Sequence, residues 1–162
     1  MASASKESRE MKFKILEGLT AGEASHFLEL CQEKKYSDGA SLFTEKEKAT
    51  TLYLILKGCI ELRFEMPGRR QAHGTVITKL RPGEAVGWST VVPPFRYSLS
   101  GYCRGETAVL EMDEPALTSL FESDYRVGFI IMRNVASLVG ERLYRIEDAL
   151  AKCMGEEILS EW

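Results

Sequence analysis

The chain has 162 residues and a formal net charge of −3, with a sequence pI near 5.6. This length suits one domain, and a composition with 44% hydrophobic and 28% charged residues is typical of a soluble globular protein. The sequence has no basic stripe that would favour nucleic-acid binding, and no apolar run approaches the ~18 residues of a membrane span. The N-terminus lacks the apolar core of a secretion signal, and the four cysteines stand far apart. We therefore expect reduced thiols and a cytoplasmic protein.

The chain divides into a polar tail at residues 1–10 and a single domain at residues 11–162. Within the domain, residues 11–34 are expected to be helical, because apolar residues recur there at helical spacing. Thr20 followed by Glu23 has the pattern of a capping box, so the second of two short helices should begin near Thr20.

Residues 35–112 have the pattern of short strands that follow one another every 8–12 residues. Glycine-containing pairs separate these strands, at Asp38–Gly39, Lys57–Gly58, Pro67–Gly68, Pro82–Gly83 and Arg104–Gly105. This spacing predicts a mainly β fold, an antiparallel sandwich or barrel of about eight strands with flanking helices.

Residues 113–162 are expected to form a short helix from Glu114 to Phe121 and a long one from about Asp124 to Lys152 or beyond. Apolar residues of the long helix follow each other at steps of four and three: Met132, Ala136, Val139, Leu143, Ile146 and Leu150. Such a seam is typical of helices that pair, so these residues are the predicted homodimer interface. A second apolar set, which includes Val135 and Leu138, is expected to face the protein's own sheet. The alternative is a helix that packs only within its own chain.

A candidate anion site lies between Leu80 and Ser100, where glycines mark a turn and Arg96 precedes a predicted strand. A guanidinium offers a two-pronged fork to an anion, and backbone amides in a turn add oriented dipoles. The predicted ligand-binding residues are Gly87, Trp88, Ser89, Arg96, Tyr97 and Ser98. We expect the Arg96 guanidinium to point into a concave pocket here. The alternatives are an ordinary corner with a surface arginine, and a Tyr97 that serves only as a strand residue.

Two segments carry a resemblance to a known family. Residues 39–62 have glycine, phenylalanine, glutamate, Leu-Tyr-x-Ile and a second glycine in step with that family's pattern, and residues 80–87 match its Leu-x-x-Gly-x-x-x-Gly spacing. On these residues the chain resembles the cyclic nucleotide-binding domain of catabolite activators and kinase regulatory subunits. The resemblance implies a β-roll of the jelly-roll type (a double-stranded β-helix) and places Arg96 at the family's phosphate-binding arginine.

The sequence departs from the family at Trp88, where cyclic nucleotide binders have a glutamate that accepts from the ribose hydroxyl. An indole only donates, so this contact is lost, and Trp88 either stacks on a planar ring or fills the pocket. The long helix is also not followed by a basic segment, so we expect no helix-turn-helix and no DNA binding. Output would pass through an unidentified protein partner or a change in assembly.

No catalytic motif is visible, and His26 and His73 have no neighbours at metal-ligand spacing. We therefore expect neither an enzyme nor a metal site, and no tightly held cofactor. Two functions stay open. One is a non-catalytic sensor in which residues 87–98 bind a cyclic nucleotide or another small anion and the long helix carries the signal. The other is a dimerising protein-interaction module whose pocket has collapsed.

Overall fold

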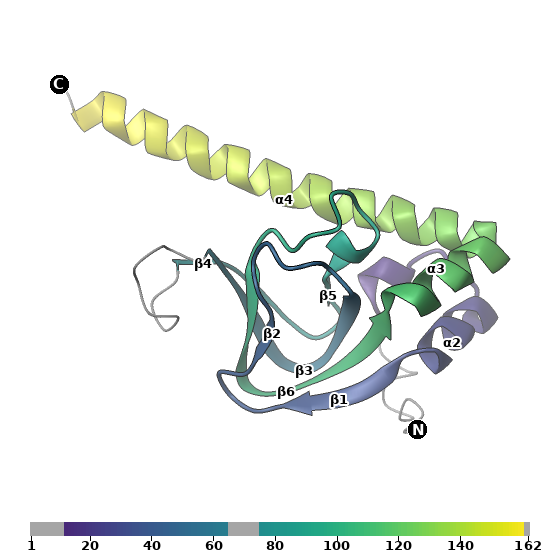
Figure 1. Ribbon diagram of the computed structural model, residues 1–162. Coiled ribbons are helices and arrows are strands. Elements are labelled where there is room, and N and C mark those ends of the chain that lie inside the picture. The colour runs from purple at the N-terminus through teal and green to yellow at the C-terminus, as the bar shows by residue number, and fades with distance from the viewer. Residues whose placement is uncertain (1–11, 65–74, 161–162) are drawn as a thin grey trace.

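The computed structural model describes residues 12–64 and 75–160. In chain order the elements are η1 (Lys14–Leu16), α2 (Ala21–Glu29), β1 (Gln32–Tyr36), β2 (Ser41–Phe43), β3 (Thr51–Phe64), β4 (Thr75–Leu80), β5 (Ala85–Val86), η3 (Trp88–Thr90), β6 (Ser100–Asp113), α3 (Glu114–Ser123) and α4 (Tyr125–Ser160). Figure 1 shows the strands curled into a roll, with α2, α3 and the start of α4 gathered at one end.

Two long strands, β3 and β6, form the centre of the sheet. The strand order is β1-β6-β3-β4, with β2 also paired to β6 and β5 to β3, and every pairing is antiparallel. The predicted fold class, an antiparallel β-roll with flanking helices, is confirmed. Within residues 12–64 and 75–160 the sheet has six strands instead of about eight, and it is not closed.

The difference in strand number arises at two glycine pairs that were predicted to be turns. Gly58 lies inside β3 and Gly105 inside β6, and both have positive φ. The β3–β6 pairing shifts register around Lys57, so these glycines form bulges within paired strands. A Cβ at Gly58 would lie 2.6 Å from the carbonyl oxygen of Glu106, so only glycine fits there. Each pair of predicted strands is therefore one long strand.

The N-terminal helical region is shorter than expected. Its first part is a single 3-10 turn, η1, and β1 already begins at Gln32. The predicted capping box is confirmed: the Glu23 amide donates to Thr20 Oγ1 at 3.3 Å, and the Thr20 amide donates to Glu23 Oε2 at 2.7 Å. The predicted tail at residues 1–10 and the turn at Pro67–Gly68 lie outside the described residues.

Two apolar clusters form the core. One fills the roll and includes Ile55, Ile60 and Val109. The other lies between the sheet and the helices, where Phe27 and Ile131 are fully buried. The described cysteines are free thiols, with Cys31 and Cys103 buried and Cys59 half-buried. Side chains alternate in direction along β3 and β6, so some of them point into the core inside the roll and others into the core beneath the helices.

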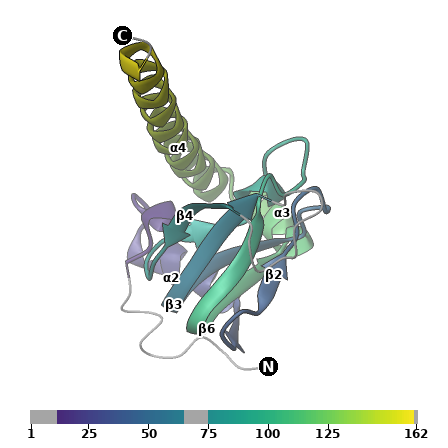
Figure 2. The same ribbon diagram turned by 90° about the vertical axis from the view of Figure 1, so that its left-hand side faces the viewer.

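The predicted C-terminal helices are confirmed. The Asp113 side chain accepts from the amide of Ala116 at 2.9 Å and caps α3, and α4 follows after Asp124 as one helix of 36 residues. The first half of α4 lies against η1 and α3, while its second half extends past the roll (Figures 1 and 2). Among the described helices, none is both long and apolar enough to span a bilayer.

Candidate functional site

The segment that carries the predicted site, residues 87–98, is called the cassette below. It starts at Gly87, which has a φ of +85° and precedes the 3-10 turn η3. A Cβ at Gly87 would lie 2.4 Å from the carbonyl oxygen of Thr51, so a side chain cannot be accommodated. Thr90 closes the turn, since its amide and its hydroxyl both donate to the Gly87 carbonyl, at 3.0 and 2.7 Å. Sequence and backbone therefore agree on why glycine is needed here.

A small cavity lies beneath the cassette. Its volume is about 10 Å³, which is room for about one water molecule. The residues that line it are Phe43, Leu62, Val86, Gly87, Trp88, Ser89, Tyr97, Ser98, Leu99 and Arg142. Five of the six predicted ligand-binding residues thus meet at one cavity, and a residue of α4 replaces the sixth.

Tyr97 serves mainly as a core residue. Its ring is 5% exposed and stacks on Phe43, with 4.2 Å between the centroids. Its hydroxyl donates to the Thr51 carbonyl and accepts from the amides of Thr50 and Thr51, each at 3.2 Å. Tyr97 lies just before β6 and not within a strand, but its ring faces the core as the alternative interpretation expected, and it also borders the cavity.

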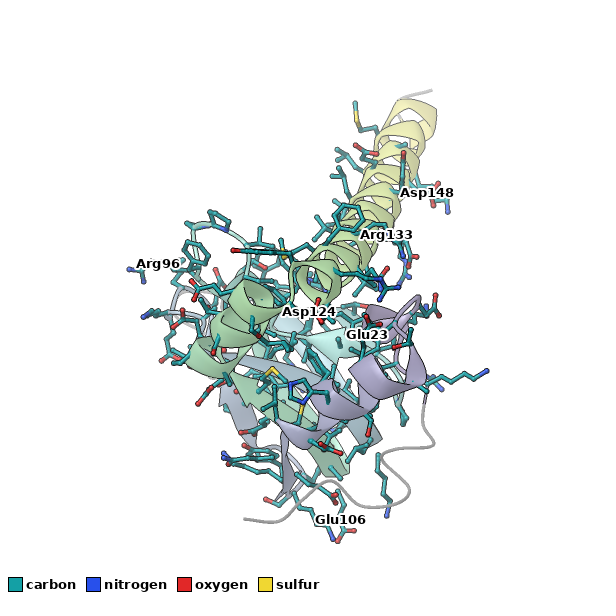
Figure 3. All side chains as sticks on the ribbon, turned by 90° about the vertical axis from the view of Figure 1, so that its right-hand side faces the viewer. Glu23, Arg96, Glu106, Asp124, Arg133 and Asp148 are labelled. Atoms are coloured by element: carbon teal, nitrogen blue, oxygen red, sulfur yellow. The ribbon has the colours of Figure 1, made fainter. Side chains whose placement is uncertain are left out.

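Arg96 does not point into the cavity, so its predicted orientation is wrong. Its Nη1 donates to the Lys46 carbonyl at 2.7 Å, and the side chain is exposed. Figure 3 shows Arg96 at the edge of the molecule, directed away from the roll. Burial alternates along residues 96–99, just before β6: Tyr97 and Leu99 are buried, whereas Arg96 and Ser98 are exposed, although Ser98 also borders the cavity. Arg96 also forms an isolated antiparallel bridge with Lys48, which fixes this alternation.

Arg142 of α4 is the cation that lines the cavity, and the sequence analysis missed it. Its guanidinium carbon lies 5.6 Å from the centroid of the Trp88 ring, within the range of a cation–π contact. Burial, and then the like charge of Arg145, lowers the pKa of Arg142. A sequence signal did exist. Arg142 follows Leu138 by four residues, so a charge interrupts the apolar row that faces the sheet.

Trp88 and Arg142 also line a larger hollow between α4 and the sheet, called the groove below. Its volume is about 540 Å³. Its lining is mostly apolar and comes from the edge of the sheet and from one face of α4 between Leu138 and Leu150: Phe64, Val76, Ile77, Thr78, Leu80, Glu84, Ala85, Trp88, Leu138, Glu141, Arg142, Arg145, Ile146, Ala149 and Leu150. Trp88 and Arg142 therefore form a wall shared by the cavity and the groove.

The predicted dimer seam is mostly exposed on α4, and two of its residues, Ile146 and Leu150, also line the groove. Met132, Leu143, Ile146 and Leu150 are large apolar residues that are 36–59% exposed in the single chain. Val139 differs, because it packs against the core between sheet and helices. The same exposed stripe extends toward the start of the helix through Phe129, which is 67% exposed.

A second group of charges lies on β3 and β4. Glu61 is buried and forms ion pairs with Arg63 at 2.5 Å and with Lys79 at 3.1 Å. The hydrogen bond from Arg63 holds the pKa of the Glu61 carboxyl below its usual range. Within residues 12–64 and 75–160, no three His, Cys, Asp or Glu side chains are placed to hold a metal ion.

Comparison with known families gives one match: the family described as "Cyclic nucleotide-binding domain" matches residues 33–124. This range contains the roll, the cassette and α3. No curated protein sequence matches the chain.

Solved structures share the fold along most of the chain. A putative cyclic nucleotide-binding protein from Geobacter metallireducens GS-15 is 25% identical, with a TM-score of 0.69 over 81% of this chain and 92% of the other. The catabolite activator protein of Thermus thermophilus is 22% identical, with a TM-score of 0.71 over 85% of this chain and 62% of the other. The regulatory subunit of a cAMP-independent protein kinase A from Trypanosoma brucei is 14% identical, with a TM-score of 0.66 over 83% of this chain and 44% of the other.

Proposed function

This chain belongs to the cyclic nucleotide-binding domain family, a family of regulatory domains, and from that premise we propose that it is a non-catalytic sensor of a small anionic ligand. The ligand binds at the cassette, and α4 carries the signal to a second copy of the chain or to a protein partner. The proposed location is the cytoplasm, as expected for a sensor of a soluble metabolite.

The observation that supports this proposal most is the contact between Trp88 and Arg142. It joins the cassette to α4 directly, and the cavity beside it has room for only about one water molecule. A ligand that enters the cavity must therefore displace the wall formed by these two side chains. Because the ligand and the closed wall exclude each other, binding favours a different position of α4, which is the condition for a switch.

The chemistry of the cavity favours an anion. Ser89 and Ser98 supply hydroxyl groups, and Arg142 supplies a partly desolvated positive charge. Charge-assisted hydrogen bonds to such a group are stronger than neutral ones. The solved structure from Trypanosoma brucei is described as cAMP-independent, so this fold also occurs in a protein whose action does not depend on cyclic AMP.

Cyclic AMP is expected to bind weakly. Trp88 stands where family members have the ribose-binding glutamate, and a buried hydroxyl without its partner costs about 1–3 kcal/mol. Such a loss weakens binding about tenfold to a hundredfold, which leaves a Kd of tens of micromolar or more. Calorimetry decides, and a submicromolar Kd would contradict the assigned effect of Trp88.

The proposed output is a parallel two-fold dimer through the seam of α4. The exposed stripe on α4 consists of several large apolar side chains and not of one isolated residue: Met132, Leu143, Ile146 and Leu150. Burying each such side chain contributes about 1.5–3 kcal/mol to the free energy of association. In a symmetric dimer each residue contributes twice.

The proposal is tested by thermal unfolding with a panel of cyclic mononucleotides, cyclic dinucleotides and small carboxylates. A ligand at a hundred times its Kd adds about 2.7 kcal/mol to the free energy of unfolding. Ser98→Tyr should abolish the stabilisation by the ligand, because Ser98 is an exposed residue that lines the cavity and a larger side chain there blocks it. Ser41→Tyr, at an exposed position of β2, is the matched control and should keep it.

One observation favours the second candidate, a dimerising interaction module without a ligand. The cavity is nearly filled in the single chain. If no compound of the panel raises the melting temperature while the protein sediments as a dimer, this second function replaces the first.

A further inference from the structure

The groove has the features of a ligand site that the cavity lacks. Its volume of about 540 Å³ lies within the range of small-molecule sites, and its lining is mainly apolar with a few charged groups. Leu80 and Ala85 line it from the sheet, and Leu138 and Ile146 line it from α4. An apolar body of ligand size would therefore contact both the roll and the helix.

One cation in the groove has no hydrogen-bonded or ion-paired partner among the residues that the structure describes. Arg145 lies 3.7 Å from Glu141, and the Glu84 carboxylate accepts from the Arg81 amide at 2.7 Å. Among the described residues Arg142 has no hydrogen bond and no ion pair; its guanidinium lies over the ring of Trp88, and the Glu84 carboxylate acts on it electrostatically without forming an ion pair. The groove thus presents a guanidinium without a hydrogen-bonded partner beside the face of an indole, with its charge partly offset by Glu84.

We propose, on the basis of the proposed sensor function, that the ligand is an amphipathic anion that spans the cavity and the groove: its acidic group pairs with Arg142, which lines both, and its planar apolar body lies in the groove next to Trp88. Arg142 replaces Arg96 as the anion-binding residue. The consequence is a short path for the signal, because the anion-binding side chain belongs to α4 itself.

Arg96 is the alternative anion-binding residue, and two observations disfavour it. Its guanidinium already donates to the Lys46 carbonyl, and it faces away from the cavity. An anion at Arg96 would have no contact with α4 that the structure shows. The same anion at Arg142 would contact the helix from the moment of binding.

The chain has two tryptophans, so Trp162→Phe leaves Trp88 as a single fluorescent reporter at the groove. The probe is 1-naphthoate, a planar ring with a carboxylate, and its neutral partner is 1-naphthalenemethanol. We expect naphthoate to change Trp88 fluorescence and to bind at least about tenfold more tightly than the alcohol, as a charged hydrogen bond predicts. Equal affinity for the acid and the alcohol would overturn the proposal.

Two matched arginine variants assign the anion. Arg142→Gln should lower the affinity for naphthoate about tenfold or more and leave the affinity for the alcohol unchanged, which shows that the groove is still intact. Arg96→Gln should change neither affinity. The opposite pattern, with the loss at Arg96, would overturn the role of Arg142.

Two alanines of α4 test the place of the apolar body. Ala149 lines the groove, whereas Ala151, two residues later, does not, and both are exposed. Ala149→Phe should block naphthoate, and Ala151→Phe should not. If Ala149→Phe instead dissociates a dimer and naphthoate does not bind, the groove is an interface between copies and the proposal is wrong.

The experiments distinguish failure of the ligand class proposed here from failure of the sensor function. If naphthoate does not bind but another anion of the thermal panel does, the sensor function stands and the ligand class proposed here is wrong. If no anion of either set binds, both proposals fail.

Discussion

The two halves of α4 differ in what they contact. In the first half, Val127, Ile131 and Val135 are at most 2% exposed and belong to the core between sheet and helices. In the second half, Leu143, Ile146 and Leu150 are all more than half exposed, although the helix is continuous. The first half of α4 thus has a buried apolar row that stabilises the fold, with Phe129 and Met132 on its exposed side, whereas the large apolar residues of the second half named here are exposed and available to a partner or a ligand.

The largest expected effect concerns the free half. Leu143→Asp places a charge opposite its own copy in the proposed dimer, and each lost leucine costs about 1.5–3 kcal/mol, counted twice. Sedimentation velocity at micromolar concentration should show a monomer. Tyr144→Asp is the control, because Tyr144 is 74% exposed but lies off the seam, and this variant should stay a dimer. A wild-type monomer would contradict the dimer.

The next effect concerns the packed half. Ile131→Ala removes a fully buried side chain and should lower the free energy of unfolding by about 2–5 kcal/mol. Urea unfolding in the Leu143→Asp background measures it without a contribution from dissociation. Met132→Ala, the neighbouring residue at 36% exposure, should cost about 1 kcal/mol or less. Similar losses of unfolding free energy for Ile131→Ala and Met132→Ala would contradict the difference between buried and exposed apolar residues of α4.

A smaller effect is expected where the packed half of α4 meets η1. Asn134 Nδ2 donates to the carbonyl oxygens of Ile15 at 2.9 Å and Glu17 at 2.8 Å, and so ties α4 to η1. Asn134→Ala should cost about 1–2 kcal/mol, because these carbonyls are only partly buried. Ser137→Ala, at an exposed position one turn later, should be neutral in the same urea titration.

The smallest effect is an ion pair on the surface of the packed half, where Arg126 donates to the Glu23 carboxylate of α2. This hydrogen bond lowers the pKa of Glu23 from 4.5 to about 2. Because the pKa of this carboxyl is lowered in the folded protein, the pair stabilises the fold at pH values above the ordinary pKa. This stabilisation is lost as the pH falls through the lowered pKa. Glu23→Gln keeps an acceptor for the capping box, so it should lower the melting temperature slightly at pH 6 and not at pH 2. A difference that persists at pH 2 would contradict the pair.

Much of the fold could be predicted because the sequence signals were local. The capping box at Thr20, the start of α3 after Asp113 and the length of α4 depend on neighbouring residues, and each is confirmed. The strand count failed at Gly58 and Gly105, because a glycine in a bulge and a glycine in a turn look alike until the partner strand is known.

The residues of the cavity show the same limit of local sequence signals. Five of its predicted residues belong to one segment of 12 residues, and local spacing was enough to find them. Arg142 comes from 44 positions beyond Ser98, and only the packing of α4 on the sheet brings it there. Arg96 was misplaced because the resemblance fixed its position in the chain, whereas the alternation with Tyr97 decides its direction.

The hydrogen bonds of Asn134 give α4 the geometry of a lever. At 1.5 Å per residue, Arg142 lies about 12 Å along the axis from this anchor, and Ser160 lies about 39 Å from it. A rotation of about 10° around Asn134 moves Arg142 by about 2 Å and the far end of the helix by about 7 Å. The arm therefore magnifies a displacement about threefold, so a shift the size of one atom beside Trp88 becomes a shift comparable to the radius of a helix at its tip.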